Sequence, residues 1–489
     1  MTNFEKWRAA HRPLLARIAR FAFPQNLTLY LVGGAVRDII AGVHKKNPDL
    51  DFCVERNAIG FARRLAALLK AGFVVLDREH GCARVVIKQN EGGVTTLDFS
   101  DFRGPTLSED LLHRDFTVNS MAICLNKAFF TDGLDTLLID PYRGRKDMRD
   151  KVVRLVHPRS FDEDPVRVLR AFSLASLFDF RIEPKTSCLI RAKKNLLRTV
   201  AAERVRDELF KIFSSGNAAS AIAALDKNGI VKIIFPEAVA MHSFSRAKGK
   251  GLDIWKHTLA TVEHTERVCA TFSRNTDVRA YLAHEVSSGR NRQQVLILAA
   301  LIHDFGKPKT FRRLKDKVSF HGHERLGASM AAEISARLKL STEEMRMLKR
   351  IVFLHLRPGY LVTNPVLTAR AKYRFFRDAS TDAAAILLLA IADERSTRGY
   401  LLLEKIRRRY ERVIPRLLRE YFSRQRTVPA TRLVDGHRLM RHLGLTPSPL
   451  VGKLLRELEE AQALGVIRTA AEALEFARRT IKRVSKKTH

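Results

Sequence analysis

Two carboxylates near the N-terminus, Asp49 and Asp51, directly precede the apolar run Phe52–Val54. In a strand, residues i and i+2 lie on one face, so these two side chains should be neighbours. Neighbouring carboxylates repel each other unless a cation lies between them. Mg²⁺ binds carboxylates and keeps positions open for phosphate oxygens and an attacking hydroxyl. The spacing therefore predicts a Mg²⁺ site, although an isolated Asp-x-Asp is more often an acidic strand edge.

A glycine turn, Gly33-Gly34, precedes these carboxylates and follows the apolar pair Leu31-Val32. Two glycines let the backbone approach a triphosphate. The N-terminus of a following helix would offer unpaired N–H groups and a partial positive charge. Arg37 can add a phosphate contact. Beside an Asp-x-Asp pair, this turn predicts a nucleotide-binding site.

A third segment, residues 112–122, adds further polar candidates. Arg114 could bind the triphosphate or the sugar, and Asp115 and Asn119 are four residues apart, so they could meet on one helix face. Asp98 lies in the predicted strand Val94–Phe99 and is a candidate third carboxylate. An ordinary strand acid is the open alternative for Asp98.

The elements that must hold these residues form a mixed α and β region. Short apolar runs predict strands at Leu29–Val32, Phe52–Val54, Val74–Leu76 and Val85–Ile87. Helical spacing covers Ala58–Leu69. After about residue 160 the strand pattern ends, and helical patterns follow, including Asp164–Leu177 and Glu203–Phe213. The predicted fold class is α+β, with a mixed head followed by an all-helical remainder.

The charge of the chain favours a nucleic-acid partner. Its 87 Lys and Arg outnumber 52 Asp and Glu, which gives a formal net charge of +35. A field of that sign attracts polyanions, and phosphate contacts dominate nucleic-acid affinity. A generally basic, solvated surface is the alternative.

The cysteines and the hydropathy pattern indicate the compartment. The five cysteines form no Cys-x-x-Cys pair, which argues against a disulfide scaffold and against a zinc knuckle. The longest apolar run, Ala383–Ala392, is too short to cross a bilayer. We therefore expect a cytoplasmic protein without a membrane partner.

The three N-terminal segments together resemble the class II tRNA nucleotidyltransferase and bacterial poly(A) polymerase family. That family carries Gly-Gly-x-Val-Arg-Asp, then Asp-x-Asp, then Arg-Arg-Asp-Phe-Thr-x-Asn-x-x-Ala, and this chain matches all three in order. The one departure is His113, where the family usually has the first of two arginines. The resemblance spans about residues 28–213 and implies a nucleotidyltransferase head of the DNA polymerase beta type.

The segment Glu163-Asp164-Pro165-Val166-Arg167 resembles the nucleobase-reading motif of that family. On a helix, Asp164 and Arg167 would point the same way. A carboxylate accepts from the exocyclic amine of cytosine or adenine, and a guanidinium donates to the neighbouring ring nitrogen, whereas uracil and guanine present the opposite polarity. The resemblance adds Arg170 to the nucleotide-binding residues. An ordinary salt bridge is the alternative interpretation of the pair.

A second group of residues resembles the metal ligands of the HD superfamily of metal-dependent phosphohydrolases. Its members are spread over separate predicted helices and could converge on one or two divalent ions: His257, His303, Asp304, His323, His355 and Asp393. His321 competes with His323 for the third histidine position. The metal could serve hydrolysis or stability alone, and the sequence identifies neither the ion nor a substrate.

The resemblance implies four regions: a nucleotidyltransferase head (1–145), a helical neck (146–250), an HD domain (251–400) and a helical RNA-binding tail (401–489). It implies a CCA-adding enzyme of the HD-containing type that extends tRNA from CTP and ATP. In this mechanism a tRNA 3′-hydroxyl attacks the α-phosphate and pyrophosphate leaves, with Mg²⁺ at Asp49 and Asp51.

Alternatives within the same chemistry are an A-adding or CC-adding enzyme and a poly(A) polymerase. The first two depend on a loop, Phe102–Leu111, whose motion one sequence does not reveal. The third is less favoured because Leu76–Val85 lacks a Gly-Arg-Arg-Phe-like stretch. From other classes, an HD phosphohydrolase with an inactive head and an RNA-binding scaffold stay open, as does the oligomeric state.

Overall fold

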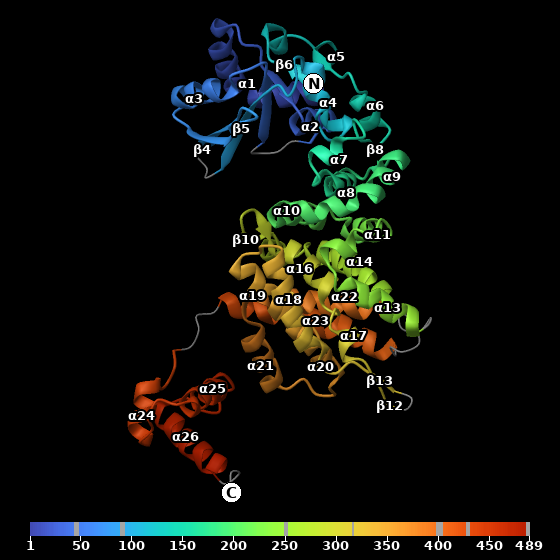
Figure 1. Ribbon diagram of the computed structural model, residues 1–489. Helices are drawn as coiled ribbons and strands as arrows, with labels where there is room; N and C mark the ends of the chain where they lie inside the picture. The colour runs from blue at the N-terminus through green and yellow to red at the C-terminus, as the bar shows by residue number, and fades with distance from the viewer. Residues whose placement is uncertain are drawn as a thin grey trace. The chain divides into compact units, whose positions relative to one another are not determined.

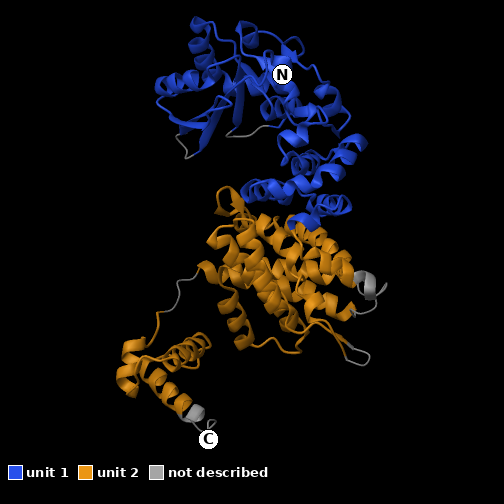
Figure 2. Cartoon of the chain, in the orientation of Figure 1, with its two compact units in different colours: residues 1–234 blue, residues 235–489 orange. Residues whose placement is uncertain are grey.

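The structure is a computed structural model that describes residues 1–43, 48–88, 93–248, 253–314, 317–397, 404–426 and 431–485. The chain divides into two compact units, Met1–Ile234 and Phe235–His489 (Figure 2). Unit 1 contains a large mixed sheet with helices. The described part of unit 2 is helical apart from two short β-hairpins. The predicted α+β fold class is confirmed.

Unit 1 is built on a seven-stranded sheet with the order β3-β4-β5-β2-β1-β6-β7 (Figure 1). Within it β2 and β5 run parallel, and the other neighbouring pairs run antiparallel. The strands are β1 (Tyr30–Val32), β2 (Asp49–Val54), β3 (Gly72–Asp77), β4 (Cys82–Lys88), β5 (Val94–Asp101), β6 (Ala122–Cys124) and β7 (Leu138–Ile139). The strands predicted from apolar runs are therefore present, most of them with longer bounds.

The register of the sheet places the candidate residues side by side. Asp51 of β2 lies opposite Val32 on one neighbouring strand and opposite Asp98 on the other. Val32 is the last residue of β1, so the Gly33-Gly34 turn begins next to Asp51. Because residues paired across a sheet have close side chains, the pairing alone brings Asp98 to the carboxylate site.

Helices surround this sheet and continue beyond it in unit 1. The N-terminal helix α1 begins with a capping box between Thr2 and Glu5 and buries Phe4, Trp7 and Ile18. The helices of unit 1 are α1 (Asn3–Ala22), α2 (Gly34–Ala41), α3 (Ala58–Leu69), α4 (Leu107–Leu112), α5 (Leu134–Leu137), α6 (Gly144–Arg149), α7 (Ser160–Glu163), α8 (Arg167–Phe178), α9 (Pro184–Lys193), α10 (Ala202–Ser214), α11 (Ala218–Lys227) and α12 (Val231–Ile234).

The structure corrects the predicted helix Asp164–Leu177. Two helices replace it, because α7 ends at Glu163 and α8 begins at Arg167, with Asp164 extended at φ −147° and ψ 95°. Pro165 explains the break, since the residue before a proline is disfavoured in the helical region. Asp164 and Arg167 therefore do not share one helix.

The prediction that strands end at about residue 160 is also wrong. The short strand β8 (Val152–Val153) pairs in parallel with β9 (Arg181–Ile182). Unit 2 adds the hairpins β10 (Glu285–Ser287) with β11 (Arg290–Asn291) and β12 (Arg312–Leu314) with β13 (Lys317–Ser319). These strands are two or three residues long, too short to leave a period-2 pattern in the sequence.

Unit 2 packs around two apolar helices. Every residue of α16 from Gln294 to Ile302 is buried, and α22 is buried almost throughout, because both are apolar on all faces. The helices are α13 (Ala238–Lys248), α14 (Ile254–Phe272), α15 (Thr276–Ala283), α16 (Arg292–Ile302), α17 (Lys307–Thr310), α18 (His323–Arg337), α19 (Thr342–Leu354), α20 (Arg357–Thr363), α21 (Ala369–Ala379), α22 (Ala383–Ser396), α23 (Glu404–Arg426), α24 (Gly436–Leu443), α25 (Pro449–Ala463) and α26 (Ala470–Ser485).

The last three helices form their own small core around Leu439, Leu454 and Leu458. Glu460 of α25 pairs with Arg370 and Arg374 of α21, at 2.9 and 2.8 Å. The apolar run predicted to be too short for a membrane span lies within the buried helix α22. Among the described residues, no helix combines the length and apolarity that crossing a membrane requires.

A buried glycine ties the turn after β7 to the nucleotide-binding segment. A Cβ at Gly144 would lie 2.1 Å from the carbonyl oxygen of Thr117 and 2.9 Å from Met121 Cγ. We expect Gly144→Ala to lower the free energy of unfolding by about 1–3 kcal/mol, because it overpacks a rigid backbone contact. Differential scanning calorimetry measures this loss.

Gly133→Ala is the matched control, because no atom lies within 4 Å of its added Cβ. We expect it to change the stability by less than about 0.5 kcal/mol. Equal effects of the two substitutions would show that the Thr117 contact does not matter.

Candidate active site and metal centre

A cavity of about 500 Å³ in unit 1 collects most of the residues predicted for the nucleotide site. Its volume lies within the usual range for ligand pockets. The predicted residues in its lining are Gly33, Gly34, Arg37, Asp49, Asp51, Arg114, Asp115, Asn119, Arg167 and Arg170. The sheet, α2, the segment after α4 and helix α8 thus meet at one place.

The carboxylates on β2 carry the signature of a cation site. Asp49 is exposed and accepts a hydrogen bond from Thr96 Oγ1 on β5. The pKa of the Asp51 carboxyl is raised to about 6, mainly by burial and also by the nearby Asp98 and Asp49, against the lowering effect of Arg114. A divalent cation would relieve this crowding of negative charge, and oxygen donors suit a hard ion.

Asp98 lies beside Asp51 but already has a partner. Arg84 of β4 donates from Nε and Nη2 to the two oxygens of Asp98, both at 2.7 Å. Such bidentate pairs are among the stronger charge-assisted hydrogen bonds. A metal ion at Asp98 would therefore compete with a guanidinium, which distinguishes it from Asp49 and Asp51.

The glycine turn gives Arg114 its place beside Asp51. Gly33 has φ 70° and ψ −134°, a conformation that side chains rarely adopt. A Cβ there would approach Arg114 Nη1 to 3.1 Å and Asp51 Oδ2 to 3.4 Å. Asp110 holds the guanidinium from behind, through Arg114 Nη2 at 3.0 Å. The positive φ favours glycine at this position, and a side chain there would also crowd the Arg114 guanidinium.

Four of the predicted nucleotide ligands brace one another. Asn119 receives a hydrogen bond from Arg37 Nη1 at 2.8 Å and donates to Asp115 Oδ1 at 2.9 Å. Arg170 donates to Asp115 Oδ2 and to Glu208 Oε1, both at 3.1 Å. Burial would raise the pKa of Asp115, but Arg170 and Asn119 lower it overall. The network keeps charged groups aligned along the cavity.

Asp115 and Asn119 meet as predicted, but they do not share a helix. Asn119 ends the 3₁₀ turn η2 (Thr117–Asn119), and Asp115 precedes that turn. A 3₁₀ turn is wound more tightly than an α-helix and also brings residues that are close in sequence into contact. The turn η2 therefore allows Asp115 and Asn119 to meet without an α-helix.

Asp164 and Arg167 form only a long ion pair with each other, Oδ2 to Nε at 3.9 Å, and among the described residues they leave one acceptor and one donor without a hydrogen-bond partner. Arg167 spends Nη1 and Nη2 on Ser160 Oγ at 2.6 Å and on the carbonyl oxygen of His113 at 2.7 Å. Asp164 Oδ2 accepts from Arg204 at 2.8 Å. Within the described part of the chain, the buried atoms Asp164 Oδ1 and Arg167 Nε have no hydrogen-bond partner. Unsatisfied buried groups are costly and commonly await a ligand.

In unit 2 the six predicted metal ligands converge. His257 Nε2 lies 3.0 Å from Asp393 Oδ1 and 3.4 Å from Asp304 Oδ2, and His303 Nε2 lies 3.2 Å from Asp304 Oδ2. On the other oxygen, Asp304 Oδ1 lies 3.4 Å from His323 Nε2 and 3.9 Å from His355 Nε2. Asp304 thus joins two groups, His257 with His303 and His323 with His355, each of which could hold an ion.

The histidine rings are oriented from behind, as metal ligands usually are. His303, His323 and His355 direct Nδ1 at the carbonyl oxygens of Ala300, Phe320 and Val352, at 2.8, 2.8 and 2.6 Å. Ser396 Oγ lies 3.0 Å from His257 Nδ1. The Nε2 atoms therefore face the centre.

The donor set fits a divalent cation. His257 Nε2, His303 Nε2 and both Asp304 oxygens are buried without a hydrogen-bond partner among the described residues, although they lie close to one another. Atoms that converge without being aligned for hydrogen bonds are arranged as around an ion. Lys307 Nζ lies 2.5 Å from Asp304 Oδ2 and partly balances the charge of this carboxylate.

Comparisons with known proteins find separate matches for the parts of the chain that carry the two sites. Residues 29–154 match the poly A polymerase head domain, residues 179–241 match a probable RNA and SrmB-binding site of polymerase A, and residues 254–395 match the HD domain. An A-adding tRNA nucleotidyltransferase of Deinococcus radiodurans is 33% identical over 92% of this chain and 94% of its own length.

The chain belongs to the tRNA nucleotidyltransferase and poly(A) polymerase family. It is thus an enzyme. Also similar are a CC-adding tRNA nucleotidyltransferase of Geobacter sulfurreducens, 30% identical over 95% of this chain and 94% of the relative, and a multifunctional CCA protein of Tolumonas auensis, 28% identical over 65% and 72%. The fold is that of a Thermotoga maritima CCA-adding enzyme solved with tRNA, with a TM-score of 0.59 at 23% identity over 96% and 95% of the two chains.

Several residues of this nucleotidyltransferase lay outside the sequence prediction. Arg103 lines the cavity, Arg84 holds Asp98, and Ser396 faces His257. No spacing marks them, because each acts from an element distant in the chain. His157 could have been noticed as a histidine shortly before the Glu163-Asp164 motif, but its partner becomes evident only in the fold.

We expect the purified protein to bind a divalent metal and His303→Ala to lose most of it, because this fully buried side chain faces Asp304 and Asp393. Inductively coupled plasma mass spectrometry of the purified variant measures the metal content. His284→Ala changes an exposed histidine of the same unit and should retain the wild-type content. An unchanged metal content in His303→Ala would place the metal elsewhere.

Proposed function

We propose that this enzyme adds CCA to the 3′ end of tRNA from CTP and ATP, without a nucleic-acid template. The observation that carries the proposal is the orphaned pair Asp164 Oδ1 and Arg167 Nε. An acceptor beside a donor suits the amine and ring nitrogen of cytosine and of adenine alike, and it opposes uracil and guanine. One protein edge could therefore serve both C and A addition. Because two relatives are named A-adding and CC-adding enzymes, the test below also distinguishes these two specialised activities from full CCA addition.

The reaction in this proposal is a single displacement at phosphorus. The tRNA 3′-oxygen forms a bond to the α-phosphorus of the nucleotide, the bond to the β-phosphate oxygen breaks, and pyrophosphate leaves. Asp49 and Asp51 would hold Mg²⁺, which supplies charge neutralisation and lowers the pKa of a bound hydroxyl. Asp98 remains a proposed third carboxylate.

The remaining site residues bind and orient the nucleotide in the proposal. The Gly33-Gly34 turn brings N–H groups to the phosphates, and Arg114 adds a cation beside Asp51. Around them, a braced network lines the cavity and would keep its charges fixed during the reaction; its nucleotide-binding members are Arg37, Asp115, Asn119 and Arg170.

For the rest of the chain, we propose the division into head (1–145), neck (146–250), HD domain (251–400) and RNA-binding tail (401–489). Asp304 and its neighbouring histidines would hold one or two divalent ions and support a second, phosphohydrolase activity. The charge of +35 supports binding of tRNA along the neck and tail. Five free cysteines and a tRNA substrate support a cytoplasmic location.

Nucleotide addition to tRNA transcripts that end in the discriminator base, in C or in CC tests the proposal, with each NTP and Mg²⁺. We expect ordered addition of C, C and A that then stops. Addition to only one of these termini would show that the protein is a CC-adding or an A-adding enzyme instead. Long A tails would show that it is a poly(A) polymerase. Absence of addition would overturn the nucleotidyltransferase function.

We expect Asp51→Asn to lower the rate of addition by at least about 10²–10³-fold, as removal of a group that stabilises transition-state charge does. Rapid-quench measurement of single-turnover rates gives the loss. Glu79→Gln removes an exposed acid of the same head and should keep the wild-type rate. A near wild-type rate for Asp51→Asn would contradict the proposed mechanism.

A further inference from the structure

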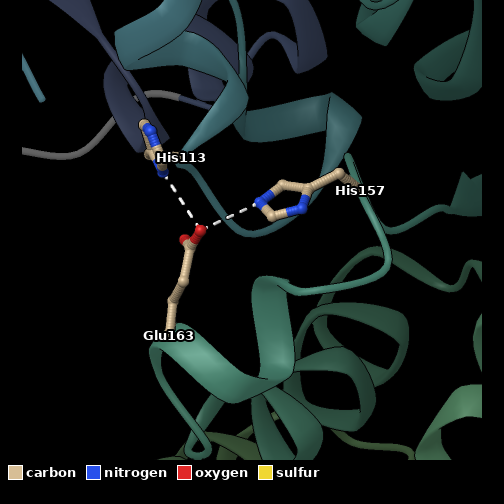
Figure 3. Close-up of side chains that lie close together, drawn as sticks. All are labelled: His113, His157 and Glu163. Atoms are coloured by element: carbon tan, nitrogen blue, oxygen red, sulfur yellow. Dashed lines mark hydrogen bonds and ion pairs between the residues drawn. The ribbon is translucent and has the colours of Figure 1, made fainter. Parts of the chain in front are cut away.

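Beside the base-reading pair lies a cluster of two imidazoles and a carboxylate (Figure 3). His113 follows α4, His157 lies in the loop after β8, and Glu163 ends α7. His113 Nδ1 contacts Glu163 Oε1 at 3.0 Å, and His157 Nε2 lies 3.1 Å from the same oxygen. Three segments that are separate in the chain are thus joined at a single carboxylate oxygen.

The second oxygen of Glu163 reaches the base-reading arginine. Arg167 Nη1 donates to Glu163 Oε2 at 3.3 Å, and Arg167 Nη2 donates to the carbonyl oxygen of His113 at 2.7 Å. With both terminal nitrogens occupied, the guanidinium plane has little freedom, and Nε is the group left without a partner. Ser160 Oγ also accepts from Nη1, at 2.6 Å, so Glu163 is one of the acceptors that fix the direction of the Nε–H group.

Two imidazoles and one carboxylate could also bind a metal ion, but the hydrogen bonds argue against it. The backbone N–H of Arg159 donates to His157 Nδ1 at 3.2 Å. In a neutral imidazole only one ring nitrogen carries the proton, so Nδ1 has the lone pair and Nε2 carries the proton. A metal would need the lone pair on Nε2, which faces Glu163. The Arg167 guanidinium also supplies positive charge where an ion would.

His113 is then a hydrogen-bond donor to Glu163, and His157 places its protonated nitrogen 3.1 Å from the same oxygen. His113 Nδ1 must donate because a carboxylate oxygen only accepts, and the tautomer of His157 places its proton toward the same oxygen. His157 Nε2 is buried and forms no well-aligned hydrogen bond with the described residues, so Glu163 is the group it serves by proximity.

We propose that His113 and His157 are positioning residues that set nucleobase selectivity by fixing Glu163 and, through it, Arg167. This inference rests on the proposed function, since it assumes that Arg167 reads the base. It assigns a role to the one residue, His113, at which this chain departs from the arginine usual in its family.

The test compares His157→Leu and His113→Ala with the wild-type full-length protein. The measured quantity is the ratio of kcat/KM for CTP to that for UTP on a tRNA transcript. We expect His113→Ala to lower this ratio about tenfold, the usual consequence of losing a hydrogen bond to a charged group, and His157→Leu to lower it measurably in the same direction. A purely structural role would lower kcat/KM for both nucleotides equally and leave the ratio unchanged, which would overturn the proposal.

Conservative variants keep the test informative if the first ones fold poorly. His113→Arg and His157→Gln retain an N–H donor toward Glu163, and His113 is exposed enough to accept a longer side chain. We expect both to restore most of the selectivity. Failure of both to restore it in folded protein would contradict the proposal. His80→Leu is the matched control, because His80 contacts Asp77 at 2.8 Å on an exposed turn of the same unit and should leave the ratio unchanged.

Two further outcomes separate this inference from the proposed function. If the wild type adds no nucleotide, the proposed function fails. The variants can then still be compared by the ratio of the Kd for CTP to the Kd for UTP, measured by equilibrium binding. An unchanged Kd ratio would then overturn the inference as well. If Zn²⁺ binds the wild type and His157→Leu removes that binding, the cluster is a metal site and the positioning role is wrong.

Discussion

The head is organised around the need to hold several carboxylates together at the edge of a cavity. Asp51 stands between two strands, with Asp98 opposite it on β5 and Asp49 two residues away. Their mutual repulsion and the burial of Asp51 raise its pKa. Two arginines of the same unit offset part of this negative charge: Arg84 pairs with Asp98, and Arg114 lies at the glycine turn. The proposed Mg²⁺ would lie at Asp49 and Asp51, whose carboxylate oxygens suit a hard cation.

The proposed base-reading residues are surrounded by charged groups that pair with one another. Most buried charges of unit 1 satisfy one another, as Asp115 does with Asn119 and Arg170. Against that background, Asp164 Oδ1 and Arg167 Nε are, with His157 Nε2, the buried side-chain atoms of the described part of unit 1 that lack a hydrogen-bond partner. Because the neighbouring polar groups are already hydrogen-bonded, they hold Asp164 Oδ1 and Arg167 Nε in a defined direction. A mobile guanidinium would instead form hydrogen bonds with other groups.

In unit 2 the charged groups of the candidate metal centre are arranged differently from those of the head. The ligand atoms of Asp304, His257 and His303 converge without aligned hydrogen bonds, and the backs of the rings are fixed by main-chain carbonyls or a hydroxyl. Buried helices such as α16 carry this set, so the ligand positions follow from the packing of an apolar core. The nucleotide site, in contrast, lies on turns and strand ends, where backbone N–H groups are available.

The sequence alone supplied the candidate residues of the two sites, because the proposed chemistry requires particular types in a fixed local order: Asp-x-Asp on a strand, glycines before a helix, and His-Asp after an apolar helix. It also determined helix α3, whose spacing matches its bounds. The sequence did not determine that Pro165 separates Asp164 from the helix of Arg167, nor that Arg84 pairs with Asp98, nor that two histidines meet at Glu163. These contacts join segments distant in the chain, and only the register of the sheet and the packing of the loops bring them within hydrogen-bond distance.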